Sequence, residues 1–351
     1  MKPEPIRIEP VFSERLWGSR SLAPLFPEKS NLEVPIGEAW LTGVDCLIST
    51  GPFTGNKLGE AWREMPVEWR GTELASVKDF PLLLKFIFPT DKLSIQVHPD
   101  DAYAAIHEQA AGGRGKTEMW HIVSAQPNAR LLLGMKPGAT KETFKRALAD
   151  RTLESLLISW PVHADDTFFV PARTPHTIGA DMVVFEVQEY SDLTYRVYDY
   201  GRLDAHGQPR ELHIEKALEV MAFESAEGGK VDPLPLPSAE EETEHSLLAA
   251  CRYFATERVR FSKKCEFAPG AGHFELLVIL QGHGNLGWTG GAARYHRGEC
   301  WLLPASLGQA GLHALEATTV IRTYVPDIAK LRTDLHREGI AAAVLAQVIH
   351  D

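Results

Sequence analysis

The sequence of 351 residues has little cysteine. The four cysteines lie far apart and form no Cys-x-x-Cys pair: Cys46, Cys251, Cys265 and Cys300. A disulfide framework or a zinc knuckle would need closer cysteine spacing than this. We therefore expect reduced thiols, as in a cytosolic protein.

Positive charge is also scarce. Lysine and arginine number 36 against 47 acidic residues, which gives a formal net charge of −11. Nucleic acids and anionic membranes bind to basic surfaces, so we expect neither as a partner. Any phosphate group that binds must meet a local cluster of cations.

Long apolar runs are missing as well. No run approaches the ~18 residues that span a bilayer, and no apolar stretch follows the single basic residue of Met1–Pro5. These absences predict a soluble, cytoplasmic protein. Its length exceeds the usual ~100–200 residues of one domain, which indicates two domains or one duplicated unit.

Short runs rich in β-forming residues dominate the chain and are separated by Gly, Pro and Asp. They are Leu82–Phe88, Leu93–Val97, Met119–Ser124, Thr167–Val170, Met182–Glu189 and Leu193–Tyr198. Such spacing is typical of a barrel or sandwich. Helical spacing predicts helices over Thr140–Leu157, Glu211–Phe223 and Ile328–Ile349. The fold class is therefore mainly β, with attached helices.

Residues 227–245 contain Gly228-Gly229, three prolines and the acidic run Glu240-Glu241-Glu242. This composition predicts a linker without regular elements of its own. We place a first domain at 1–226, with a helical insertion near 138–160 and a helix near 211–223. A second domain, ending in a helix, follows at 246–351.

The two sides of this linker resemble each other. Asp165–Ala172 can be laid over Gly298–Ala305, and Glu118–Val123 over Glu275–Leu280. The gap between the two blocks is longer in the first copy, where the insertion falls. The simplest interpretation is a duplicated β-barrel whose first copy contains the helical insertion.

Ligand-type side chains are concentrated in the first copy. Gln96 and His98 project from the same face of a predicted strand, Glu118 returns after a loop, and His176 follows a second apolar run. Nothing like Gln-x-His precedes Glu275, which we interpret as a leftover or surface strand residue. The pattern predicts a metal site in the first copy only. An amide, two imidazoles and a carboxylate suit Zn²⁺, and also Fe²⁺, Mn²⁺ or Co²⁺.

Six strings occur in an order that resembles the type I phosphomannose isomerase family in its short bacterial form. They are Trp17-Gly18, Gly37–Trp40, Pro81–Phe86, Leu93–Pro99, Gly115–Trp120 and Ser191–Arg196. The resemblance implies two cupin barrels, each a small jelly roll, of which the second is degenerate. It also implies a mannose-6-phosphate isomerase that interconverts mannose 6-phosphate and fructose 6-phosphate. Carried over by position, the ligands of one Zn²⁺ per chain would be Gln96, His98, Glu118 and His176, with Arg196 catalytic.

Isomerisation through an enediol needs a base near the carbon and positive charge near the developing enediolate. Arg196 could supply the charge, unless it only pairs with a neighbouring aspartate. Lys116, two residues from a ligand, could act as the base; a metal-bound hydroxide is the alternative. Lys85 and Arg114 are the candidate phosphate-binding residues.

Other residues and functions remain in view. We expect His121 to face away from the site and His107 to lie on a surface helix over Tyr103–Gln109. Arg173 stands where the family usually has glycine, so the turn is either rebuilt or strained, with Arg173 touching substrate. The alternative functions are a glucose 6-phosphate isomerase, an iron-dependent bicupin oxygenase and a sugar-binding cupin without catalysis. We expect a monomer or weak homodimer.

Overall fold

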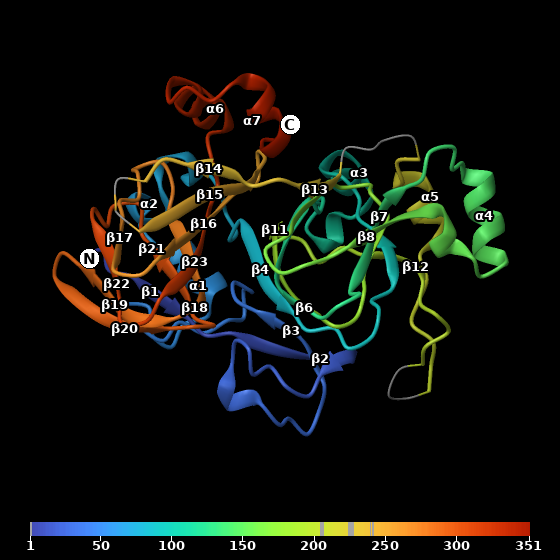
Figure 1. Cartoon of the computed structure of the whole chain (residues 1–351), viewed down its shortest axis with the longest axis horizontal. Helices are drawn as coiled ribbons and strands as arrows, with labels where there is room; N and C mark the ends of the chain where they lie inside the picture. Colours follow the sequence, from blue (N-terminus) through green and yellow to red (C-terminus); the bar gives the residue numbers. More distant parts are fainter. Residues whose placement is uncertain (1, 204–206, 224–227, 239, 241) are drawn as a thin grey trace.

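The computed structural model describes residues 2–203, 207–223, 228–238, 240 and 242–351. It is mainly β, as the sequence predicts, with its strands in four sheets (Figure 1). No helix in the described part of the chain is both long and apolar enough to cross a membrane.

The first half of the structure consists of a seven-stranded and a five-stranded sheet. The larger has the strand order β13 (Gly229–Val231), β9 (Thr167–Val170), β6 (Glu118–Ala125), β11 (Met182–Glu189), β4 (Leu82–Ile87), β3 (Ile36–Trp40), β2 (Val11–Ser19). The smaller has the order β12 (Tyr195–Tyr198), β5 (Ile95–Val97), β10 (His176–Ile178), β7 (Arg130–Met135), β8 (Leu157–Pro161). All six predicted strands are therefore present, with small changes at their ends.

The second half repeats this plan. Its seven-stranded sheet has the order β1 (Ile6–Ile8), β21 (Cys300–Leu303), β18 (Glu275–Gln281), β23 (Thr318–Tyr324), β16 (Ala255–Phe261), β15 (Thr243–Ala250), β14 (Leu234–Leu236). A four-stranded sheet has the order β17 (Lys264–Phe267), β22 (Ala310–Ala314), β19 (His283–Trp288), β20 (Gly291–His296).

Strand pairs at equivalent positions of the two large sheets have the same register. Glu118 pairs with Val170 on the neighbouring strand, and Glu275 pairs with Leu303 in the same way. These are the residues that the sequence comparison superimposes. The two large sheets therefore share the same strand register at these positions.

One apolar cluster joins the two halves, and two others fill their interiors. One cluster joins the outer faces of the two large sheets and includes Met119 and Phe185 from the first half and Leu276 and Ile321 from the second. The other two fill the interior of each half, between its large and small sheets. Because side chains alternate along a strand, each large sheet serves both its own interior and the contact between halves. The interior face of the first half is where the predicted ligands lie.

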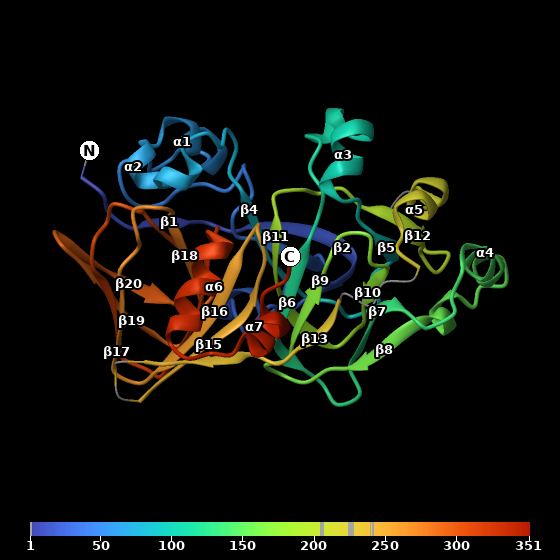
Figure 2. The ribbon, with the colours of Figure 1, turned by 90° about the horizontal axis from the view of Figure 1, so that it is seen from above.

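The helices are shorter than the sequence predicts. The insertion between β7 and β8 contains α4 (Lys141–Ala149) and a 3₁₀ turn (Leu153–Leu156), and the chain leaves α4 through Arg151, whose φ is +58°. The second predicted helix is α5 (Ile214–Val220). Both α4 and α5 pack on the outer face of the five-stranded sheet, at one end of the molecule (Figure 2).

The C-terminal helix is divided into α6 (Ile328–Arg337) and α7 (Ala342–Val348). Gly339, with φ of +92°, ends the first because glycine adopts a left-handed conformation without strain. Three further helices, α1 (Leu58–Glu64), α2 (Val67–Arg70) and α3 (Asp101–His107), complete the described α-helical segments. Trp62 of α1 packs against Phe274, so this N-terminal region covers the second half (Figure 2).

Two expectations about the chain's organisation are wrong. The linker contains regular elements, because β13 pairs with β9 of the first half and β14 with β15 of the second. Residues 1–226 are not confined to the first half either, since β1 is hydrogen-bonded to β21. Residues 226, 227 and Glu241, at the predicted boundary and in the acidic run, lie outside the described residues.

Candidate metal centre

Three of the four predicted ligands converge in the interior of the first half. Ligand-type atoms of His98, Glu118 and His176 all lie within 4.8 Å of one another. The Nε2 of His176 is 3.4 Å from Oε1 of Glu118, and the Nε2 of His98 is 3.8 Å from Oε2. All three side chains are at most 1% exposed.

Strand alternation and register explain this convergence. Ile95 and Val97 of β5 are buried against the helices outside, so Gln96 faces inward. Gln96 is the direct partner of His176 on β10, and its Nε2 lies 3.3 Å from the imidazole Nε2. Turning the amide over would place the Gln96 oxygen there instead. The fourth predicted ligand therefore lies beside the other three.

Both imidazoles are oriented by backbone carbonyls. The Nδ1 of His98 lies 2.7 Å from the oxygen of Leu193, and the Nδ1 of His176 lies 2.9 Å from that of Thr174. With Nδ1–H donating, each Nε2 keeps a lone pair directed into the cluster, which is how proteins prepare histidine for a metal ion. Burial, with the nearby charge of Lys116, lowers the pKa of His98 well below its usual range. Burial also lowers the pKa of His176 to about 4, so both rings are neutral at pH 7.

The carboxylate of Glu118 lacks its usual partners. Oε2 is paired with Nζ of Lys116 at 2.8 Å, and Oε1 has no hydrogen-bond donor among the described residues. Burial, followed by the negative charge of Glu186, raises the pKa of Glu118 to about 7. A buried carboxylate with free acceptor positions beside two neutral imidazoles fits a divalent cation.

Lys116 belongs to this cluster. Its Nζ lies 2.8 Å from Oε2 of Glu118 and 3.2 Å from Nε2 of His98, and the side chain is 4% exposed. Lys116 is a buried cation in direct contact with two predicted ligands.

Arg196 lies at the edge of the cluster, on β12 opposite Gln96. Its Nε donates to the hydroxyl of Ser94, which in turn donates to Oε1 of Gln96, both at 3.3 Å. Its Nη1 donates to the carbonyl of Glu211. These acceptors are neutral, so the guanidinium is not neutralised by Asp192 or Asp199.

The two phosphate candidates occupy different environments. Lys85 of β4 is buried and forms an ion pair with Glu186, Nζ to Oε1, at 3.2 Å. Arg114 lies on the half-buried loop before β6, and its guanidinium has no charged partner among the described residues. Only Lys85 lies in the interior of the first half.

The backbone of Arg173, in the turn before His176, has the strained conformation that the sequence offered as one alternative. Its φ is +70°, in the left-handed region that favours glycine, and its Nε donates to the carbonyl of Val220 at 2.8 Å. The turn leading to His176 is therefore not rebuilt.

Glu186 and Trp120 were not singled out from the sequence. The Nε1 of Trp120 donates to Oε2 of Glu186 at 3.1 Å, and the indole packs edge-on against the His176 ring at 5.3 Å between centroids. One signal was available, since Glu186 and Gln188 are alternate polar residues in an otherwise apolar strand and so share one face.

The remaining histidines and Glu275 lie elsewhere. His121 is buried beside Thr167 and Asp165, away from the ligands, and His107 is exposed at the end of α3. Glu275 is not a surface residue: it is fully buried and paired with Arg322.

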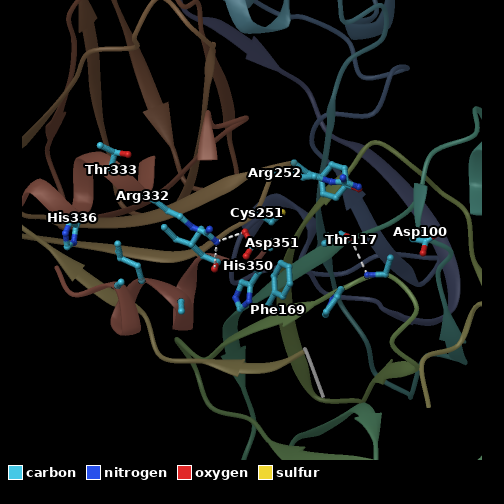
Figure 3. A pocket seen from close by; sticks show the side chains of 17 residues that line it. Asp100, Thr117, Phe169, Cys251, Arg252, Arg332, Thr333, His336, His350 and Asp351 are labelled. Atoms are coloured by element: carbon cyan, nitrogen blue, oxygen red, sulfur yellow. Dashed lines mark hydrogen bonds and ion pairs between the residues drawn. The ribbon is translucent and has the colours of Figure 1, made fainter. Parts of the chain in front are cut away.

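A separate cavity of about 920 Å³ lies between the halves (Figure 3). Phe169, with His350 stacked on it, and the helices α6 and α7 line it. It contains none of the four predicted ligands, but Asp100 and Thr117 on its wall lie close in sequence to His98 and Glu118.

Comparisons with known proteins agree with this geometry, although no protein-family model matches the chain. A probable mannose-6-phosphate isomerase of Bacillus subtilis is 34% identical over 317 residues, covering 87% of this chain and 95% of the relative. A mannose-6-phosphate isomerase of Streptococcus mutans is 32% identical over 311 residues, covering 87% and 93%.

Among solved structures, a mannose 6-phosphate isomerase from Bacillus subtilis gives a TM-score of 0.81 at 29% identity, covering 91% of this chain and 99% of that one. A structure of mannose 6-phosphate isomerase bound with zinc and yttrium gives a TM-score of 0.69 at 16% identity, covering 92% of this chain and 99% of that one. Because the identity is so low, this similarity bears on the fold alone. The resemblance noted in the sequence is confirmed: the chain belongs to the mannose-6-phosphate isomerase family.

Proposed function

We propose that this chain interconverts mannose 6-phosphate and fructose 6-phosphate through an enediol, with one Zn²⁺ held by Gln96, His98, Glu118 and His176. The observation that carries the proposal is the buried cluster of two oriented imidazoles and a carboxylate with free acceptor positions. Family membership at 34% identity and a zinc-bound relative support the substrate and the metal.

The donor set fits zinc, since nitrogen and oxygen ligands of this kind are typical of catalytic zinc sites. When bound, the ion would supply a Lewis acid that stabilises negative charge on the sugar oxygens. The same donors would accept Fe²⁺, Mn²⁺ or Co²⁺, so the metal must be identified by measurement.

The protein's own groups would move the proton and compensate the charge. Lys116, buried against Glu118 and His98, is the candidate for carrying the proton between C1 and C2. Arg196 holds a fixed positive charge that forms no ion pair with a carboxylate of the described residues, and it would stabilise the enediolate. The low exposure of the cluster would keep bulk water from the intermediate.

The phosphate group requires a cation farther from the reacting carbons. Arg114 is the stronger candidate because its guanidinium is free of charged partners in the described part of the structure. Lys85 could bind the phosphate only through ammonium hydrogens that its ion pair with Glu186 does not use.

We also infer that each half is a cupin barrel, the second without a metal site. The paired sheets around an apolar interior and their shared register support this. A cytoplasmic location and a monomeric or weakly dimeric state remain part of the proposal.

A coupled assay with mannose 6-phosphate and glucose 6-phosphate tests the function directly. We expect turnover of the first, loss of activity with a chelator and recovery with added Zn²⁺. Preference for glucose 6-phosphate would identify the alternative isomerase, and full activity in metal-free protein would contradict the metal site.

A further inference from the structure

The two halves contain one buried ion pair at equivalent positions but with opposite polarity. In the first half, Lys85 of β4 is the direct partner of Glu186 on β11. In the second half, the equivalent strands β16 and β23 carry Glu257 and Arg322, again as direct partners, with Nη1 of Arg322 2.8 Å from Oε2 of Glu257. The cation and the anion have exchanged strands.

This exchange changes what lies beside the glutamate that both halves contain, Glu118 or Glu275. Glu186 is the register partner of Trp120 on β6, and Arg322 is the partner of Leu277 on β18, each two residues after Glu118 or Glu275. The glutamate therefore has an anion on the adjacent strand in the first half and a cation in the second. All of these side chains face the interior of their half, because direct partners share a face.

The consequence appears in the hydrogen bonds. Arg322 donates from Nε to Oε2 of Glu275 at 2.8 Å and from Nη2 to Oε1, so both oxygens are engaged by one guanidinium. Glu118 has only the single ammonium of Lys116, 2.8 Å from its Oε2, and its Oε1 has no hydrogen-bond donor among the described residues. The ammonium of Lys85 is held one strand farther away, on Glu186, while the indole of Trp120 donates to the other oxygen of Glu186.

We propose that the polarity of this ion pair keeps Glu118 available to a metal ion, in addition to the imidazole ligands for which the second half has no sequence counterpart. Glu186 retains Lys85 and so keeps a second cation away from Glu118, whose Oε1 stays open to a divalent cation, whereas Arg322 engages both oxygens of Glu275. Glu186 is thus a positioning residue for the metal centre, acting through Lys85 and through the electrostatic potential at Glu118. The inference rests on the proposed metal site in the first half.

The test is a polarity swap, Lys85→Glu with Glu186→Arg, in the full-length chain. The swap keeps the net charge and a buried ion pair but places the guanidinium beside Glu118, as in the second half. We expect the swapped protein to fold and its Zn²⁺ affinity to fall at least a hundredfold. Metal content after gel filtration, a Co²⁺ absorption titration and circular dichroism give the readouts.

A matched swap in the second half, Glu257→Lys with Arg322→Glu, is the control. We expect it to leave Zn²⁺ affinity at the first site within about threefold of wild type. An equal loss in both swaps would overturn the proposal, because the effect would then be general destabilisation.

If the swapped chain does not fold, the Zn²⁺ affinity of the Glu186→Gln variant tests the proposal instead. This change removes the charge and keeps the shape, so we expect about tenfold weaker Zn²⁺ binding, estimated from one lost charge in a partly screened interior. Wild-type affinity in Glu186→Gln or in the folded swap would overturn the proposal. Failure of the wild-type chain to bind any divalent metal would instead overturn the proposed metal site itself.

Discussion

The ammonium of Lys116 lies 2.8 Å from Oε2 of Glu118, on the same carboxylate that completes the metal-ligand cluster. A lysine in this place has two roles that a mutation can separate, since it neutralises Glu118 and is near enough to the ligands to exchange a proton with bound substrate.

Lys116→Met removes the ammonium and retains the apolar part of the side chain. We expect kcat to fall by about 10²–10⁴-fold, the usual contribution of a general acid–base group. Metal should bind at least as tightly as in wild type because Glu118 loses a competing cation. Steady-state kinetics and zinc titration measure the two effects, and a variant with normal kcat would exclude Lys116 as the base.

His98→Ala should lose metal and activity together, because it removes one of the two imidazoles whose Nε2 faces the cluster. Metal content by mass spectrometry and the coupled assay provide the measurements. His107→Ala, at an exposed histidine of α3, is the matched control and should change neither. Retention of stoichiometric zinc by His98→Ala would argue against the ligand assignment.

Arg196→Ala should keep the metal and lose turnover. The guanidinium contacts Ser94 and the Glu211 carbonyl but none of the three clustered ligands, so its removal leaves the donor set intact. We expect a loss of about 10²–10³-fold in kcat, comparable to removing one donor to a developing oxyanion. Arg151→Ala, on the exposed turn after α4, serves as the control. Unchanged kcat in Arg196→Ala would refute its catalytic role.

His121 predicts a pH dependence of stability. Burial, with the nearby charge of Arg258, lowers its pKa to about 3, whereas an unfolded histidine titrates near 6.5. As pH falls below about 6.5 the unfolded state therefore binds a proton that the folded state does not, and stability falls by up to about 1.4 kcal/mol per pH unit. Above this range the contribution of His121 to the slope vanishes.

Urea unfolding of wild type and His121→Leu between pH 7 and 4 isolates this contribution. The variant curve should be shallower by about 1.4 kcal/mol per pH unit below pH 6. Parallel curves would mean that His121 is protonated in the folded protein, which would require a closer approach of Asp165 than the 3.8 Å observed.

Sequence patterns predicted the strands and the ligands because both depend on local alternation. Gln96 and His98 are recognisable as two side chains on one face, and the apolar runs give the strands almost to their ends. The single C-terminal helix was a wrong prediction, although Gly339 carried the signal for its break.

Long-range pairing is what the sequence did not reveal. The burial of Glu275 depends on Arg322, which is 47 residues away, and the position of Glu186 becomes meaningful only when β11 is placed between β4 and β6. Strand order is fixed by tertiary packing, for which a single sequence contains no local pattern.

Because of the two short strands β1 and β13, neither half has all its strands within one continuous segment of the chain. Each forms the edge of a large sheet, yet β1 precedes the first half in the chain and β13 follows it. A fragment ending at 226 would lack β13 and carry β1 without its partner β21, while one starting at 246 would lack both β1 and β14. Separately expressed fragments would therefore expose unpaired strand edges and self-associate, and co-expression would return β1 to β21 but not restore β13 or β14, which lie in neither fragment.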